Sequence, residues 1–196
     1  MGRWEPNARG RLAQAALTLY AEQGFDKTTV AEIAARAGLS ERTFFRHFAD
    51  KREVLFYGTE MAQELLARTV AEAPASATPM DAVGAALEAV GAVLQEDPER
   101  VRLRDAVVST NTELRERELI KLSAFASVMS EALRARGVPE PTASLAAEQG
   151  IAVFKVAFAG WVRESRQKDL LSILRESMVQ AKGVLSVSTT AVKDLD

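Results

Sequence analysis

Apolar residues recur along most of the chain every three or four positions, and they rarely alternate with polar residues as they would in a strand. Alanine, leucine, glutamate and arginine, which all favour helices, fill the positions between them. This pattern predicts an all-α fold, which N-cap residues, glycines and prolines divide into separate helices. The predicted helices span residues 7–23, 30–37, 40–47, 51–72, 80–95, 98–109, 112–136, 141–165 and 169–185.

The distribution of charge divides the chain into two parts. Residues 1–52 carry nine Lys/Arg against six Asp/Glu, whereas residues 53–196 carry sixteen against twenty-one, so a basic front precedes an acidic back. We therefore predict a three-helix domain over residues 1–52 and a helical bundle over residues 53–186. Residues 187–196 have little apolar periodicity, and we expect this tail to fray.

A tight turn precedes a short polar helix in the basic part. Gly38 ends the second predicted helix and Ser40 is a good N-cap for the third, so a single residue separates them. Phe44 and Phe48 lie four residues apart and should face inward as core. This spacing predicts a helix-turn-helix, whose second helix enters the DNA major groove and presents its N-terminal side chains to base edges.

The polar side chains of the predicted third helix have the chemistry that base and phosphate contacts need. Arg42 can pair with O6 and N7 of guanine, and Thr43 can contact a thymine methyl or a phosphate. Arg46 and His47 lie near the helix end, where phosphates pass. Glu41 can accept from a cytosine amino group, although an exposed glutamate in a first turn more often complements the helix dipole.

Five short features follow one another between residues 24 and 55. They are the threonine pair Thr28 and Thr29, the turn Gly38–Ser40, the run Thr43–Phe45, the pair His47 and Phe48, and Lys51. This order resembles the signature of the tetracycline-repressor (TetR) family. The resemblance implies a DNA-binding helix-turn-helix with phosphate contacts from Thr28, Thr43, His47 and Lys51.

One residue departs from the family pattern. Phe45 stands where the family often has a tyrosine, so it can pack on a sugar or a thymine methyl but cannot donate a hydroxyl to phosphate. The candidate DNA-binding residues are Thr28, Ser40, Glu41, Arg42, Thr43, Phe45, Arg46, His47 and Lys51. Two of them have simpler interpretations. Thr28, like its neighbour Thr29, can be an N-cap of the second helix, and a lone histidine near a helix end is more often a capping or core residue.

The segment Ile151–Val162 is apolar almost all round, with Lys155 its one charge, and small residues such as Gly150 and Gly160 would let another helix approach closely. An apolar stripe from Leu170 follows it. Both suit a two-fold four-helix interface, which the family resemblance also implies, and a homodimer would read a palindromic operator. The alternative is that both helices belong to the core of one monomer.

The family resemblance also implies a ligand pocket between the DNA-binding domain and the helices of the dimer interface. Candidate lining residues are Phe56, Leu65, Leu87, Val90, Leu103, Val107, Phe125, Met129, Phe154 and Trp161. Each can equally be plain core, because pockets and cores use the same residue types. Ligand binding would release the DNA, and the predicted helix over residues 51–72, which touches both domains, would transmit the change. By analogy with the family, we expect the protein to be a repressor.

A further resemblance concerns residues 97–162, which are similar to TetR-family domains described as acyl-CoA-like ligand-binding domains. It implies a fatty acyl-CoA or a similar amphiphile as the effector. Basic residues that would lie near its phosphates are Arg100, Arg104, Arg115 or Lys121. The alternative is that these charges face solvent, as charged runs on helices usually do.

Other classes of function find little support in the residues. The chain has no cysteine, a single histidine, no glycine-rich phosphate loop and no metal-spaced cluster, which argues against an enzyme, a cofactor or a metal site. An interaction bundle would not need the polar side chains at the turn. No uninterrupted apolar run of about 18 residues and no signal peptide is found, so we expect a cytoplasmic protein that does not enter a membrane.

Overall fold

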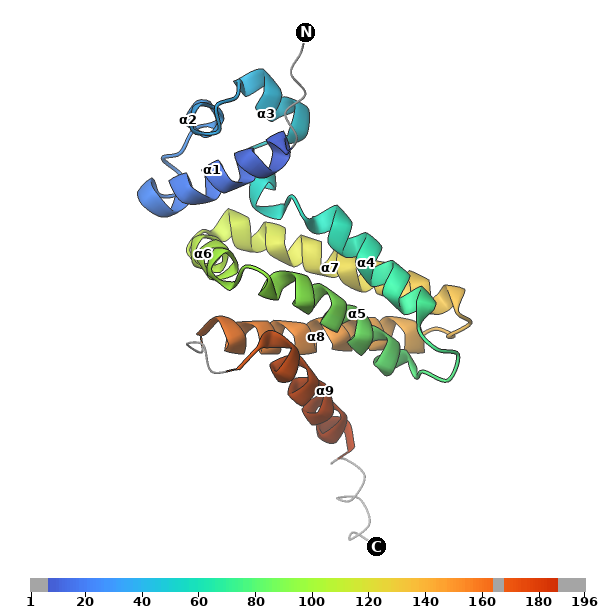
Figure 1. Ribbon diagram of the computed structural model, residues 1–196. Coiled ribbons are helices and arrows are strands. Elements are labelled where there is room, and N and C mark those ends of the chain that lie inside the picture. The colour runs from blue at the N-terminus through green and yellow to red at the C-terminus, as the bar shows by residue number, and fades with distance from the viewer. Residues whose placement is uncertain (1–6, 164–167, 187–196) are drawn as a thin grey trace, which may run out of the picture. The chain divides into compact units, whose positions relative to one another are not determined.

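A computed structural model describes residues 7–163 and 168–186. Within these ranges all regular structure is helical, which confirms the predicted all-α class (Figure 1). The helices are α1 Ala8–Gln23, α2 Val30–Arg36, α3 Glu41–His47, the 3₁₀ helix η1 Glu53–Phe56, α4 Thr59–Glu72, α5 Pro79–Gln95, α6 Pro98–Ser109, α7 Thr112–Ala135, α8 Thr142–Arg163 and α9 Leu170–Ser186. The predicted frayed tail, residues 187–196, lies outside the described residues.

The predicted single helix over residues 51–72 is wrong at its N-terminal end. The Asp50 carboxylate accepts from the amides of Arg52 at 2.8 Å and Glu53 at 3.2 Å, which begins the short η1 instead of a long α-helix. The next three side chains, residues 54–56, are all buried in the core of the first unit. The α-helix α4 starts only at Thr59, whose hydroxyl donates to the Phe56 carbonyl at 2.7 Å.

The chain forms two compact units, one of residues 1–60 and 99–120 and the other of residues 61–98 and 121–196. The first unit thus adds parts of α6 and α7 to the 52 residues that we predict as the N-terminal domain. Val107, Val108 and Leu114 from these helices belong to one apolar cluster with Leu12 and Phe44, which explains the larger unit. Arg104 of α6 also binds η1, because its Nε donates to the Leu55 carbonyl at 3.0 Å.

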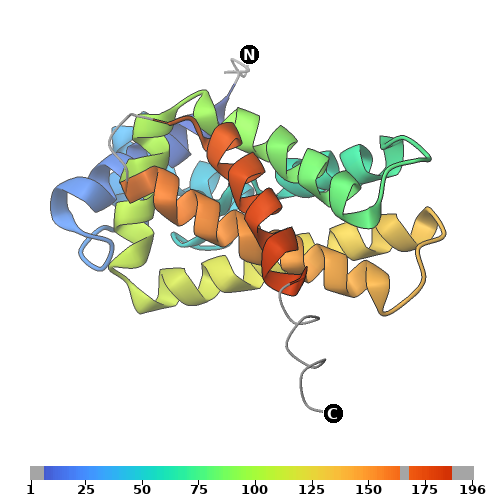
Figure 2. The same ribbon diagram turned by 90° about the horizontal axis from the view of Figure 1, so that it is seen from below.

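The second unit is built on the mutual packing of α5, α8 and α9 (Figures 1 and 2). The small residues of α8 permit the close approach of α5, because a Cβ on Gly150 would clash with the Val83 side chain. Ala143, Ala147 and Ala157 are fully buried as well. Most of the small-residue face that we associate with a partner helix is therefore covered within the chain, whereas a Cβ on Gly160 would meet open space.

The apolar helix α8 has the length and hydropathy that a membrane-crossing helix needs, and 39% of its most apolar stretch is buried in the structure. The core helix of a globular protein has the same composition. In the structure α8 packs against α5 and α9.

Candidate nucleic-acid interface

Both helices of the predicted helix-turn-helix begin at the expected N-caps. At α2 the Thr29 hydroxyl accepts from the Glu32 amide at 3.2 Å while the Glu32 carboxylate accepts from the Thr29 amide at 2.8 Å, which is a capping box. These hydrogen bonds from Thr29 lower the pKa of Glu32. At α3 the Ser40 hydroxyl accepts from the Thr43 amide at 3.2 Å. The cap predictions for Thr29 and Ser40 are confirmed, whereas Thr28 does not cap α2.

The turn between the two helices is held by a side chain that the sequence did not single out. Gly38 has φ +66°, in the left-handed region, and the Leu39 amide donates to the Ala34 carbonyl at 2.8 Å. From α1, Arg11 donates through Nε to the Ala37 carbonyl at 3.1 Å, and its Nη2 contacts the same oxygen. Arg11 therefore neutralises the carbonyl end of α2 and ties the turn to α1.

The helix α3 and its C-cap bury two phenylalanine rings and expose the charged side chains. Phe44 and Phe48 are buried, with ring centroids 5.5 Å apart, so their predicted place in the core is confirmed. Glu41, Arg42 and Arg46 are exposed, and so is the ring of Phe45, at 56% of its area. The exposed side thus offers two cations, a carboxylate and an aromatic ring from seven residues of helix.

His47 lies at the end of this helix and is half-buried. Its Nε2 is buried and has no hydrogen-bond partner within the described part of the chain. Loss of solvent lowers the pKa of His47 first, and the positive charges of Arg46 and Arg9 lower it further. The imidazole of the isolated protein is therefore neutral at pH 7 and adds no charge to the exposed face.

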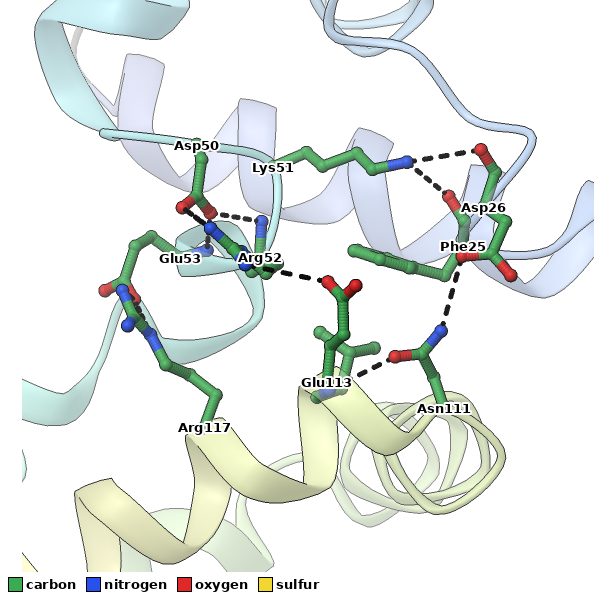
Figure 3. Close-up of polar contacts among 10 residues, drawn as sticks. Phe25, Asp26, Asp50, Lys51, Arg52, Glu53, Asn111, Glu113 and Arg117 are labelled. Carbon is green, nitrogen blue, oxygen red and sulfur yellow. Dashed lines mark hydrogen bonds and ion pairs between the residues drawn. The ribbon is translucent and has the colours of Figure 1, made fainter.

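Thr28 and Lys51 turn inward. Thr28 is 1% exposed and its hydroxyl donates to the Gly24 carbonyl at 2.8 Å. The Lys51 ammonium donates to the carbonyls of Phe25 at 2.8 Å and Asp26 at 3.3 Å (Figure 3). It also donates to the Thr28 carbonyl at 3.0 Å. The structure therefore does not place these two side chains among the exposed groups of α3.

The other described cations of the N-terminal region either form ion pairs within the first unit or are exposed without one. Arg9, Arg36 and Arg52 form ion pairs with Glu60, Glu22 and Asp50, respectively. Lys27 in the turn before α2 is exposed and, like Arg42 and Arg46, has no ion-pair partner among residues 7–163 and 168–186. The sequence analysis did not identify Lys27 as a candidate DNA-binding residue, because no sequence pattern shows that a single lysine in a turn is exposed.

The ten candidate pocket residues are divided between the two units. Phe56 and Val107 belong to the core of the first unit, and Leu103 of that unit is 38% exposed. In the second unit Leu87, Val90, Met129, Phe154 and Trp161 are buried, and Leu65 and Phe125 are half-buried. Two hollows of the second unit, of about 660 and 190 Å³, are lined by other residues.

The four candidate basic residues for a phosphate-bearing ligand have local partners in the structure. Arg104 donates to Glu118 at 2.8 Å and lies over the Phe56 ring. Arg100 lies over the Tyr57 ring, and Arg115 donates to the Thr112 hydroxyl at 3.3 Å. Lys121 is half-buried and also interacts within the chain.

Large apolar side chains are exposed on the two helices predicted to form an interface. On α8, Leu145 and Val156 are 65% and 70% exposed, and on α9, Val179 and Val184 are 70% and 74% exposed. Leu145, Ala152, Val156 and Ala159 follow a helical spacing along one side of α8. We call the exposed side chains of residues 145, 156 and 179 the α8–α9 apolar face.

Comparisons with known proteins agree with these features. The family model described as "Bacterial regulatory proteins, tetR family" matches residues 12–57. The HTH-type transcriptional regulator TcmR of Streptomyces glaucescens is 38% identical over 82 residues, which are 42% of this chain. The chain spans 36% of the length of TcmR in this match.

Solved structures extend the likeness to nearly the whole chain. SmeT, the repressor of the Stenotrophomonas maltophilia multidrug efflux pump SmeDEF, has a TM-score of 0.61 at 23% identity and covers 90% of this chain and 89% of its own. FadR from Bacillus subtilis in complex with stearoyl-CoA has a TM-score of 0.61 at 18% identity, over 88% of this chain and 96% of its own. At these identities the likeness establishes the fold.

Proposed function

Because the chain belongs to the tetR family of bacterial regulatory proteins through its N-terminal region and has that family's fold throughout, we propose that it is a DNA-binding transcriptional regulator and not an enzyme. Residues 1–52 read operator DNA in the cytoplasm, and residues 53–186 dimerise and bind a small molecule. The observation that carries the proposal is the exposed side of α3, where Arg42, Phe45 and Arg46 project from a helix fixed by Phe44 and Phe48.

The exposed side chains of α3 have distinct tasks in the major groove. Arg42, in the first turn, pairs with the O6 and N7 atoms of a guanine, and Phe45 packs on a thymine methyl. Arg46 and Lys27, exposed and without ion-pair partners in the described chain, bind phosphates. Ser40, Glu41 and Thr43 lie at the helix start, where they meet base edges or the backbone, and His47 approaches a phosphate at the helix end.

Removing the guanine-reading group should weaken and relax recognition. We expect Arg42→Ala to cost about 1–3 kcal/mol of operator affinity and to relax the preference at one base pair. Fluorescence anisotropy with the operator and with duplexes changed at single positions measures both effects. Arg36→Ala is the matched control, because Arg36 pairs with Glu22 at 2.8 Å, and it should leave the preference intact. An Arg42→Ala variant with unaltered affinity and preference contradicts this assignment.

The α8–α9 apolar face is the proposed surface for a second copy of the chain. Exposed valines and a leucine on two adjacent helices favour burial, and pairing the two helices of each protomer gives a four-helix interface. A two-fold homodimer presents two α3 helices to the DNA and therefore reads a palindromic operator.

The proposed effector is a small amphiphile such as a fatty acyl-CoA, and its binding releases the DNA. FadR, whose fold this chain shares, is described in complex with stearoyl-CoA. A ligand that prefers the conformation with wrongly spaced α3 helices must weaken DNA binding by the same factor by which DNA weakens ligand binding. The regulator is then a repressor, and α4 links the two functions.

A panel of acyl-CoAs of increasing chain length tests the effector class. We expect at least one chain length to raise the thermal midpoint of the protein and to displace it from operator DNA, with free CoA and the free fatty acid as controls. If no chain length changes either the midpoint or the DNA binding, the acyl-CoA assignment is wrong, whereas the proposed DNA binding stands.

A further inference from the structure

The side chain of Lys51 crosses between two segments that flank the helix-turn-helix. Lys51 follows α3, and its ammonium reaches the turn before α2, residues 24–29, where it donates to three main-chain carbonyls at 2.8, 3.0 and 3.3 Å. Figure 3 shows the two that belong to Phe25 and Asp26. A lysine ammonium has three N–H donors, so these three acceptors use its full capacity. The ammonium also lies 4.3 Å from the centroid of the Phe25 ring.

The main chain of the same residue is anchored as well. The Lys51 carbonyl accepts from the hydroxyl of Tyr20 at 2.6 Å, and the Tyr20 ring packs edge-on against Phe25. Burial raises the pKa of Tyr20, so its hydroxyl remains a donor over the whole physiological range. Lys51 thus joins α1, the turn before α2 and the segment after α3 at one point.

The turn that Lys51 holds has a further support from the same unit. The Asn111 side-chain amide donates to Asp26 at 3.4 Å, and its carbonyl oxygen accepts from the Leu114 amide at 3.1 Å (Figure 3). With Arg11 on the turn between α2 and α3, each end of α2 is fixed by a cation bound to carbonyls. Phosphate binding by Lys51 would require the ammonium to leave its three acceptors.

We infer that Lys51 is a positioning residue, which sets the orientation of α2 and α3 through main-chain carbonyls and does not bind a DNA phosphate. The inference rests on the proposed DNA binding. It assigns the neutralisation of DNA phosphates, which releases their bound counterions, to other cations such as Lys27 and Arg46. Loss of the Lys51 ammonium then impairs the fit of α3 in the groove without changing the number of phosphates neutralised.

The test compares Lys51→Met with Lys27→Met in the full chain. Methionine keeps the apolar stem over Phe25 but removes the three donors. For Lys51→Met we expect operator affinity to fall at least about tenfold, the loss that one misread base pair causes, with scrambled-duplex affinity and the slope of log K against log salt both unchanged. For Lys27→Met we expect the slope to decrease by about 0.9 and both duplexes to lose affinity.

Two results overturn the inference. A slope reduced by about 0.9 in Lys51→Met, with equal losses on both duplexes, identifies a phosphate ligand. A lower thermal midpoint with an unaltered ratio of operator to scrambled affinity identifies a residue that only stabilises the fold.

A measurement on the unmodified protein applies even if Lys51→Met does not fold. The Lys51 ammonium should give an ¹⁵N–¹H resonance protected from exchange in the free protein, and operator DNA should leave it unchanged. A resonance that becomes protected only with DNA contradicts the inference. Equal affinity of the unmodified protein for operator and scrambled DNA would instead refute the proposed function, and the free-protein resonance would still test the carbonyl contacts.

Discussion

Replacing Phe44 by alanine should unfold the first unit under conditions where the unmodified protein is folded. Phe44 is fully buried between the rings of α3 and the core of α1, and its truncation leaves a cavity that the helices cannot fill. Phe→Ala substitutions in cores cost about 3–5 kcal/mol, which is comparable with the whole stability of a small unit. Chemical denaturation followed by circular dichroism measures the loss.

The neighbouring ring supplies a matched control. Phe45→Ala removes an equally large side chain that is 56% exposed, so we expect the free energy of unfolding to change by no more than about 0.5 kcal/mol. The same variant should bind operator DNA more weakly, because we propose that this ring packs on a thymine methyl in the major groove. Equal destabilisation by the two variants would show that α3 does not have the orientation described above.

A glutamate at position 156 should separate the proposed dimer. Val156 is 70% exposed in the single chain and belongs to the α8–α9 apolar face. In a two-fold interface the substitution buries two unpaired carboxylates, each of which costs about 3 kcal/mol or more. We therefore expect sedimentation to give the monomer mass and operator affinity to fall by at least about a hundredfold.

Val93→Glu is the control for this experiment. Val93 is 55% exposed on α5, and the substitution adds the same charge outside the apolar face, so the dimer and its operator affinity should persist. A monomeric unmodified protein at micromolar concentration would refute the dimer outright. A dimeric Val156→Glu variant would place the interface elsewhere on the chain.

Local signals predicted most of the fold. The caps at Thr29 and Ser40, the glycine at the turn and the inward spacing of Phe44 and Phe48 are short-range features, and each is confirmed. The break between η1 and α4 was missed because it depends on buried contacts of residues 54–56, which apolar periodicity alone does not distinguish from a helix.

The candidate site was less predictable, because the role of a cation depends on what surrounds it. A lysine and four arginines of residues 1–52 bind carbonyls or carboxylates of their own unit, and the sequence cannot distinguish them from exposed Arg42 and Arg46. Thr28 illustrates the same limit, since its hydroxyl satisfies the Gly24 carbonyl. Pocket residues such as Met129 and Trp161 could not be separated from core residues, because both are apolar and buried.

The most direct test of the central claim is the selection of binding sites by the purified protein from a random duplex pool, followed by affinity measurements at two salt concentrations. The proposed dimeric regulator predicts enrichment of a palindrome whose half-sites lie about one helical turn apart, with affinity that falls steeply as salt rises. A dimeric, folded protein that enriches no sequence over the random pool would contradict the claim.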